Sequence, residues 1–380
     1  MRICLGLLAL LLACSCTHVS QSRIRELQPA MAAASYVPSG PDDFSFIDPI
    51  ARGKGMLFIG EIPHHVPAIY PAVLRLSLHL RKELGYSVVA MENVYSDWPY
   101  YEAQSLGHNA PLPNVIPESE RMGDPRPWFG PVVAYNRGAP ADQRLLATTL
   151  DLDHAIYHTK AQTVLYLGYL ASLSSSSQAR ADLAKAIPAL LGLKGRKEIH
   201  AYLDDLERRF HAARSSFSAA DQEEIDFSLA LERASIEPHL QLMSSFRYGL
   251  RGEYFRKTIE RALAKAERSG GSLTCYVGWG HAWLNQRAAD CEAGYFNQEY
   301  PATRGRVGSI LIEKLSQCDG FDLNGDFRPS ALEKAALARM GDQDRIFVDL
   351  RDKSWASVKH RPKKFFPKNG PDYDGVLFIK

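Results

Sequence analysis

One acidic residue and two imidazoles follow the first strongly apolar run of this 380-residue sequence after its N-terminal segment. The run covers residues 56–60, and Glu61, His64 and His65 come directly after it. Imidazoles titrate near neutral pH and carboxylates can orient them, which is the pairing that general acid–base catalysis uses. These residues therefore indicate a catalytic or ligand-binding site at the end of a strand.

Two later apolar runs end in residues of the same kinds. Glu92 follows residues 87–91, and Trp279 and His281 follow residues 273–277. Ligands of open α/β sheets bind outside the carboxyl ends of the strands. We therefore expect these side chains to meet those of the first run at one rim of a sheet.

A fourth run, residues 345–348, ends in Asp349 and Arg351, which we expect at the same rim. Each residue also has a structural explanation. Glu61 could cap a helix N-terminus, where a carboxylate is favoured, and Glu92 could pair with an arginine. The hypothesis of a site depends on the conjunction of these residues.

The elements that would hold the first two groups form a strand–helix–strand unit. Apolar residues between the two runs recur every three or four positions, which predicts an amphipathic helix: Ile69, Val73, Leu76, Leu80 and Leu84. Gly85 is a typical residue at the end of a helix. Because two parallel strands need a crossover of this length, the unit predicts a parallel sheet.

The remaining sequence predicts a large helical insertion before the chain returns to strands. Residues 97–148 are rich in Pro, Gly and aromatics and predict a long irregular segment with one short helix. Residues 151–268 show helical periodicity, and residues 273–277 and 375–379 are strand-like. We expect an α/β fold with a mainly parallel central sheet, flanking helices and one helical insertion.

The N-terminus has the features of a secretion signal. An apolar stretch of this length, after Arg2, suits a signal peptide and is too short to span a bilayer. Residues 11–14, Leu-Leu-Ala-Cys, resemble a bacterial lipobox. That resemblance implies removal of residues 1–13, acylation of Cys14 and anchoring in the outer or cytoplasmic membrane of a bacterial envelope. The alternative is a secretory signal cut slightly later.

Residues 14–42 then predict a tether and residues 43–380 a single domain. A net charge of +2 and the lack of a basic stripe give no indication of nucleic-acid binding. In an oxidising compartment, Cys275, Cys291 and Cys318 could include one disulfide or could remain buried thiols.

Several blocks of the sequence resemble erythromycin esterase-like proteins. They are residues 57–64 (LFIGEIPH), 251–255 (RGEYF), 273–281 and 373–379. The same superfamily includes ChaN-like haem-binding lipoproteins and Tiki/TraB proteins. The paired His64-His65 differs from the His-Gly usual in the esterases, so the resemblance does not assign a macrolide substrate.

The esterase resemblance implies a hydrolase of a small-molecule substrate that needs no cofactor. In that hypothesis His64 is the general base and Glu61 or Glu92 orients it, while His281 donates to the oxyanion or the leaving group. The substrate would also contact His65, Arg251, Glu253 and Trp279. For Arg251, a salt bridge to Glu253 or to a neighbouring helix is an equally open explanation.

Two other functions remain open at this stage. A ChaN-like protein would bind haem for iron uptake between His64 or His65 and nearby aromatics, because haem iron takes an axial histidine. A Tiki-like peptidase would use Glu61, His64 and His281 as ligands of a divalent metal.

Overall fold

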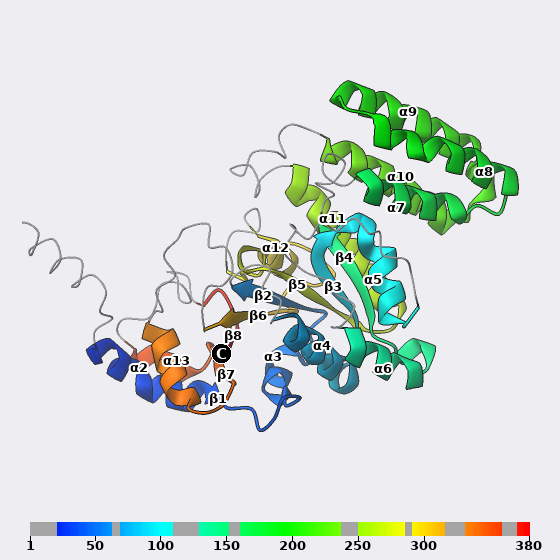
Figure 1. Cartoon of the computed structure of the whole chain (residues 1–380). Coiled ribbons are helices and arrows are strands. Elements are labelled where there is room, and N and C mark those ends of the chain that lie inside the picture. Colours follow the sequence, from blue (N-terminus) through cyan, green and yellow to red (C-terminus); the bar gives the residue numbers. More distant parts are fainter. Residues whose placement is uncertain are drawn as a thin grey trace, which may run out of the picture.

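The computed structural model describes residues 21–62, 69–108, 129–151, 160–236, 250–285, 291–315, 331–358 and 371–380, and these residues contain one eight-stranded sheet (Figure 1). Its strand order is β1-β7-β8-β6-β2-β5-β3-β4. The strands are β1 (Ser35–Tyr36), β2 (Met56–Ile62), β3 (Tyr86–Val94), β4 (Leu146–Asp151), β5 (Ser272–Gly278), β6 (Val307–Lys314), β7 (Arg345–Asp349) and β8 (Gly375–Ile379).

Six neighbouring strands, from β8 to β4, run parallel, and β7 and β1 pair antiparallel at one edge. All seven residues of β2 are buried, as expected for a central parallel strand that helices cover on both faces. The predicted α/β class with a mainly parallel sheet is confirmed.

The predicted strand–helix–strand unit is present as β2, α4 (Tyr70–Leu84) and β3. Pro71 lies in the first turn of α4, where a missing N–H costs little. Gly85 ends the helix in the left-handed conformation, with φ 80°, and its N–H reaches the carbonyls of Leu80 and Arg81. β2 and β3 are not neighbours, because β5 returns from far along the chain and lies between them.

Helices cover both faces of the sheet and enclose two separate cores. One core lies under α2 (Gln21–Ala34), α11 (Leu250–Arg268), α12 (Glu292–Gln298) and α13 (Ala331–Met340). The other lies under α3 (Asp48–Ala51), α4, α5 (Trp98–Ser105) and α6 (Gly130–Gly138). Because side chains alternate along a strand, Phe58 of β2 joins the first core, while Leu57 and Ile59 join the second.

Four helices form a lobe beside the sheet (Figure 1). They are α7 (Lys160–Ser172), α8 (Ser177–Ala186), α9 (Arg196–Ala212) and α10 (Ala219–Ser235). They have an apolar core of their own that includes Leu170, Leu206, Phe210 and Leu229. We call this lobe the helical insert.

The predicted insertion, at about residues 151–268, includes more than the helices of the lobe. Asp151 is the last residue of β4. α11 packs on the sheet and not in the lobe, because Phe255, Ile259 and Leu263 are buried in the core shared with β3 and β5. Within the described residues, the helical insert therefore covers 160–236.

The predicted irregular segment, residues 97–148, is more ordered where the structure describes it. It contains α5, α6 and the first half of β4. Pro99 and Pro131 lie in the first turns of α5 and α6, so prolines that suggest loops are compatible with helix starts.

The predicted tether is wrong for residues 21–36. Leu27 and Met31 of α2 are buried against α13 and the sheet, and β1 pairs with β7 through Ser35 and Val348. Pro29 within α2 and the alanines around it gave the segment the composition of a linker. Residues 1–20, with the predicted signal and Cys14, lie outside the described residues.

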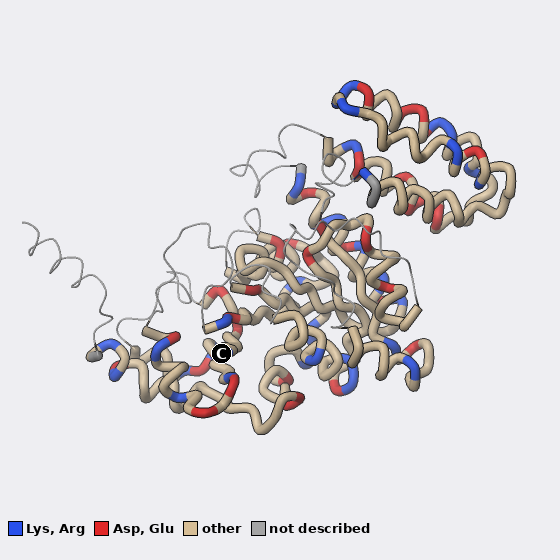
Figure 2. The backbone as a smooth tube through the Cα atoms, in the orientation of Figure 1, with Lys and Arg blue, Asp and Glu red and all other residues tan. Residues whose placement is uncertain are grey.

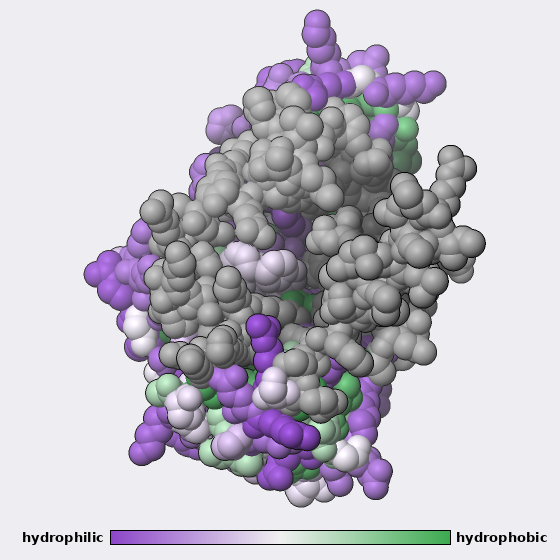
Figure 3. Space-filling model, turned by 90° about the vertical axis from the view of Figure 1, so that its left-hand side faces the viewer, coloured by the Kyte–Doolittle hydropathy of each residue, from purple (hydrophilic) through white to green (hydrophobic). Residues whose placement is uncertain are grey.

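Surface charges of both signs are interspersed over the helices (Figure 2). On the face in Figure 3, described hydrophobic residues form small patches among hydrophilic ones. Among the helices that the structure describes, none is both long enough and apolar enough to cross a bilayer.

We expect Met31→Ala to lower the free energy of unfolding by about 2–5 kcal/mol, because it empties a buried position between α2 and the body. Gln28→Ala changes an exposed residue of the same helix and is the control. Denaturant unfolding measures both. Equal stability of Met31→Ala and the control would mean that α2 does not contribute to the fold in solution.

Candidate functional site

The strands that carry the predicted acidic residues end at the same edge of the sheet. β2 and β3 both pair parallel with β5, in registers that place Glu61 opposite Gly278 and Met91 opposite Tyr276. β5 leads directly into a short 3-10 helix, Trp279–His281. Glu61, Glu92 and His281 are therefore at one rim. We call it the carboxyl rim.

Glu61 and Glu92 face opposite sides of the sheet at this rim. Leu57 and Ile59 of β2 belong to the core under α4, and Glu61 follows in the same alternation. Glu92 instead contacts Arg251 of α11, on the other side. The rim thus holds two groups of polar residues with the strand ends between them.

His281 lies between two carboxylates on the α11 side. Its Nδ1 is 2.6 Å from Oε2 of Glu292, and its Nε2 is 3.4 Å from Oε1 of Glu92. The ring stacks on Phe255 at a centroid distance of 4.9 Å. Burial by itself lowers the pKa of His281, but the two carboxylates outweigh it and raise the pKa to about 9. The imidazole is therefore cationic at neutral pH.

Arg251 is the second cation of this group. It makes a two-pronged ion pair with Asp151, at 3.0 and 2.6 Å, and its Nη2 is 3.4 Å from Glu92. Burial acts to lower the pKa of Arg251, and Asp151 and Glu92 raise it. Arg251 therefore pairs with strand ends and not with Glu253, which is exposed and bonds Lys257 at 2.6 Å.

Glu61 has a different set of neighbours. It is 2% exposed, and the Tyr276 hydroxyl donates a hydrogen bond to its Oε2. The ring of Tyr70, at the start of α4, meets Tyr276 edge-on at 5.2 Å. Burial and the Glu61 carboxylate raise the pKa of Tyr276, so its hydroxyl stays protonated and donates.

Trp279 is exposed, with 41% of its surface accessible. Its ring meets Trp283 edge-on at 4.8 Å, and Tyr373 donates to its carbonyl at 2.9 Å. Gly60 of β2 allows residues 279–282 to pack closely against the strand, because a Cβ there would lie 3.2 Å from Cα of Trp279 and 3.0 Å from Cβ of Ala282.

The prediction that Asp349 and Arg351 lie at this rim is wrong. β7 runs antiparallel to β8, with Asp349 opposite Gly375, so it ends at the opposite edge of the sheet. There Arg351 and Asp349 pair with each other at 2.8 Å.

His64 and His65 lie outside the described residues, so their predicted roles stay predictions. Cys275 and Cys291 are buried free thiols, which excludes a disulfide between them here, and Cys318 lies outside the described residues. The described residues contain no cluster of three His, Cys, Asp or Glu side chains that could hold a metal ion.

Three important residues of the rim were missed in the sequence: Asp151, Glu292 and Tyr276. Asp151 is the last residue of β4, but Thr148 and Thr149 interrupt the apolar run of that strand, so its signal was weaker than that of β2. Glu292 and Tyr276 have no such signal, because their partners lie on other elements.

Comparison with known proteins finds no matching family model and no significant match among curated proteins. Solved structures do resemble the chain. A protein from Bacillus cereus superposes with a TM-score of 0.61 at 13% identity, over 94% of this chain and 97% of that one. A mutant of the erythromycin esterase EreC in its open conformation gives 0.56 at 11% identity, over 90% and 94%. A succinoglycan biosynthesis protein gives 0.56 at 13%, over 95% and 98%.

We expect Gly60→Ala to displace the turn at residues 279–281, because the added methyl would press on the Trp279 backbone. The exposed Trp279 reports this as a change in tryptophan fluorescence and quenching. Gly40→Ala is the control, since a Cβ there meets nothing within 4 Å. A Gly60→Ala protein with the spectrum and stability of the control would contradict the tight contact.

The charge of His281 should make stability depend on pH. A folded pKa of about 9, above the usual 6.5, contributes stability that is fully present below pH 6.5 and is lost as pH rises through 9. We expect the stability advantage of the wild type over His281→Gln to shrink by up to about 3 kcal/mol across that range. Unfolding at several pH values measures it. The control His211→Gln removes an exposed imidazole of α9, and its stability should fall with rising pH as that of the wild type does.

Proposed function

Starting from the erythromycin esterase-like fold of this chain, we propose that it is a hydrolase that acts at the carboxyl rim. The observation that carries the proposal is the setting of His281. Glu292 holds its Nδ1, so its Nε2 faces Glu92 at the rim beside Arg251. A buried carboxylate next to two cations, with one imidazole nitrogen directed to the rim, suits the stabilisation of negative charge in a reaction.

His281 takes the role of proton donor in this proposal. A pKa of about 9 keeps its ring protonated at neutral pH, which disfavours a role as base and favours donation to an oxyanion or a leaving group. Glu292 is a positioning residue, because it fixes the orientation of the ring. Glu92 stabilises both His281 and Arg251.

The base that activates water would be His64, with Glu61 as its orienting carboxylate. Glu61 supports this role because Tyr276 already occupies its Oε2, which fixes the direction of the carboxylate. Arg251 and Trp279 would contact the substrate, Arg251 as a fixed positive charge and Trp279 as an accessible ring. His65 is a further candidate contact, and Glu253 is a weaker one because Lys257 holds it.

The substrate class that we propose is an ester, by analogy with the erythromycin esterase that this chain resembles in fold. The reaction would need water and side chains alone. The described residues add no observation that favours haem or a divalent metal. We also propose that the chain is anchored in a bacterial cell envelope by a lipid on Cys14.

Hydrolysis of chromogenic esters and of erythromycin tests the proposal, with the gain of one water detected by mass spectrometry. We expect His281→Gln to lower kcat by at least about 100-fold, the usual contribution of a positioned acid. The wild-type rate should also fall on the alkaline side with a pKa near 9, and this limb should disappear in His281→Gln.

His211→Gln, on the exposed face of α9, should retain wild-type turnover. If a substrate is hydrolysed equally well by wild type and His281→Gln, then His281 is not the acid. If neither esters nor erythromycin are hydrolysed, the ester class is wrong.

A further inference from the structure

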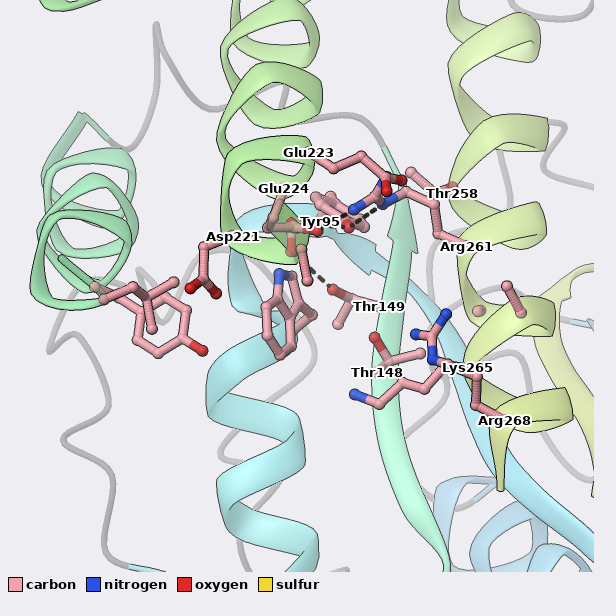
Figure 4. A pocket seen from close by; sticks show the side chains of 16 residues that line it. Tyr95, Thr148, Thr149, Asp221, Glu223, Glu224, Thr258, Arg261, Lys265 and Arg268 are labelled. Carbon is pink, nitrogen blue, oxygen red and sulfur yellow. Dashed lines mark hydrogen bonds and ion pairs between the residues drawn. The ribbon is translucent and has the colours of Figure 1, made fainter. Parts of the chain in front are cut away.

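A cavity of about 400 Å³ lies where the helical insert meets the edge of the sheet (Figure 4). The body contributes Thr148 of edge strand β4, the ring of Trp98 of α5 and the C-terminal half of α11. The insert contributes Tyr169 of α7 and Asp221 of α10. The volume is within the range of small-molecule sites, about 300–1,000 Å³.

This cavity is separate from the carboxyl rim. Arg251 stands near the start of α11, whereas Arg261, Lys265 and Arg268 of the same helix line the cavity. The ten residues from Arg251 to Arg261 correspond to about 15 Å along the helix axis. The described lining residues include neither Glu92 nor His281.

Arg261 and Lys265, two of the basic residues that line the cavity, are paired within the protein. Arg261 is 3.0 Å from Glu223 and also bonds Glu224. Lys265 bonds Glu102 and lies 5.0 Å above the ring of Trp98. Two of the three basic residues are therefore already paired. The described lining has as many acidic residues (Asp221, Glu223 and Glu224) as basic ones, so it carries no net formal charge that would favour an ionic ligand.

Polar groups with remaining capacity stand on different walls. On the body side, the Thr148 hydroxyl and the Arg268 guanidinium line the cavity and have no side-chain hydrogen bond or ion pair with another described residue. On the insert side, Oδ2 of Asp221 accepts a hydrogen bond from the Ser218 hydroxyl, and its Oδ1 is a further acceptor. Figure 4 shows Thr148, Lys265 and Arg268 grouped apart from Asp221.

We propose that this cavity binds an uncharged, hydroxyl-rich ligand of the class of a small oligosaccharide. A hydroxyl group both donates and accepts, so it suits a donor wall that faces an acceptor wall. Trp98 and Tyr169 both line the cavity, with their rings edge-on to each other at 5.7 Å, and they would contact the apolar faces of sugar rings. This inference is independent of the hydrolase proposal.

Isothermal titration of the full-length chain in detergent with neutral trisaccharides of glucose and of galactose tests the inference. Inorganic phosphate and glutamate at the same concentrations are the charged probes. We expect at least one neutral trisaccharide to bind saturably and more tightly than either charged probe. No saturable binding of a trisaccharide, or tighter binding of phosphate or glutamate, would overturn the inference.

Two variants locate the binding. We expect Thr148→Val and Arg268→Met each to weaken it about tenfold or more, because each removes a hydrogen-bond donor from the body side. Arg25→Met, an exposed arginine of α2, is the matched control and should bind as the wild type does.

Arg268 is exposed, so its replacement should leave the fold intact, which thermal unfolding checks. Trisaccharide binding should also persist in His281→Gln. Binding that survives both cavity variants, or that is lost in His281→Gln, would place the sugar elsewhere and contradict the inference.

Discussion

Buried carboxylates at the carboxyl rim require cations, and this requirement connects the elements around it. Glu92 lies near the end of β3, Asp151 ends β4 and Glu292 begins α12. Arg251 and His281 are the cations that contact them. An uncompensated buried charge costs several kcal/mol, so removing one partner would destabilise the others. The start of α11 and the turn after β5 are thereby fixed relative to the sheet.

The two-residue period of strands gives the rim its second property. The side chains of Glu61 on β2 and Glu92 on β3 project from opposite faces of the sheet, and β5 lies between these two strands. Glu92 therefore lies among the cations Arg251 and His281, whereas Glu61 lies on the other face and accepts a hydrogen bond from Tyr276.

Local patterns in the sequence predict those parts that local physics determines. The run at residues 56–60, the apolar face of α4 and the αL conformation of Gly85 follow from periodicity and glycine chemistry. β4 and β6 were missed, because Thr148-Thr149 and Gly308-Ser309 interrupt their apolar runs. The two carboxylates that flank His281 could not be predicted as its partners. Glu92 reaches it through the order of the strands, and Glu292 reaches it through the packing of α12. The direction of β7 likewise depends on long-range pairing, which is why Asp349 was placed at the wrong edge.

The packing of α2 has a consequence for where the domain would sit in an envelope. With α2 folded from residue 21, six residues separate it from Cys14. Six fully extended residues span about 20 Å, less than the diameter of a small domain. A lipid on Cys14 would therefore hold the α2 and α13 end of the molecule against the headgroups. The domain would then have a preferred orientation on the bilayer, because so short a linker would not let it rotate freely away from the membrane surface.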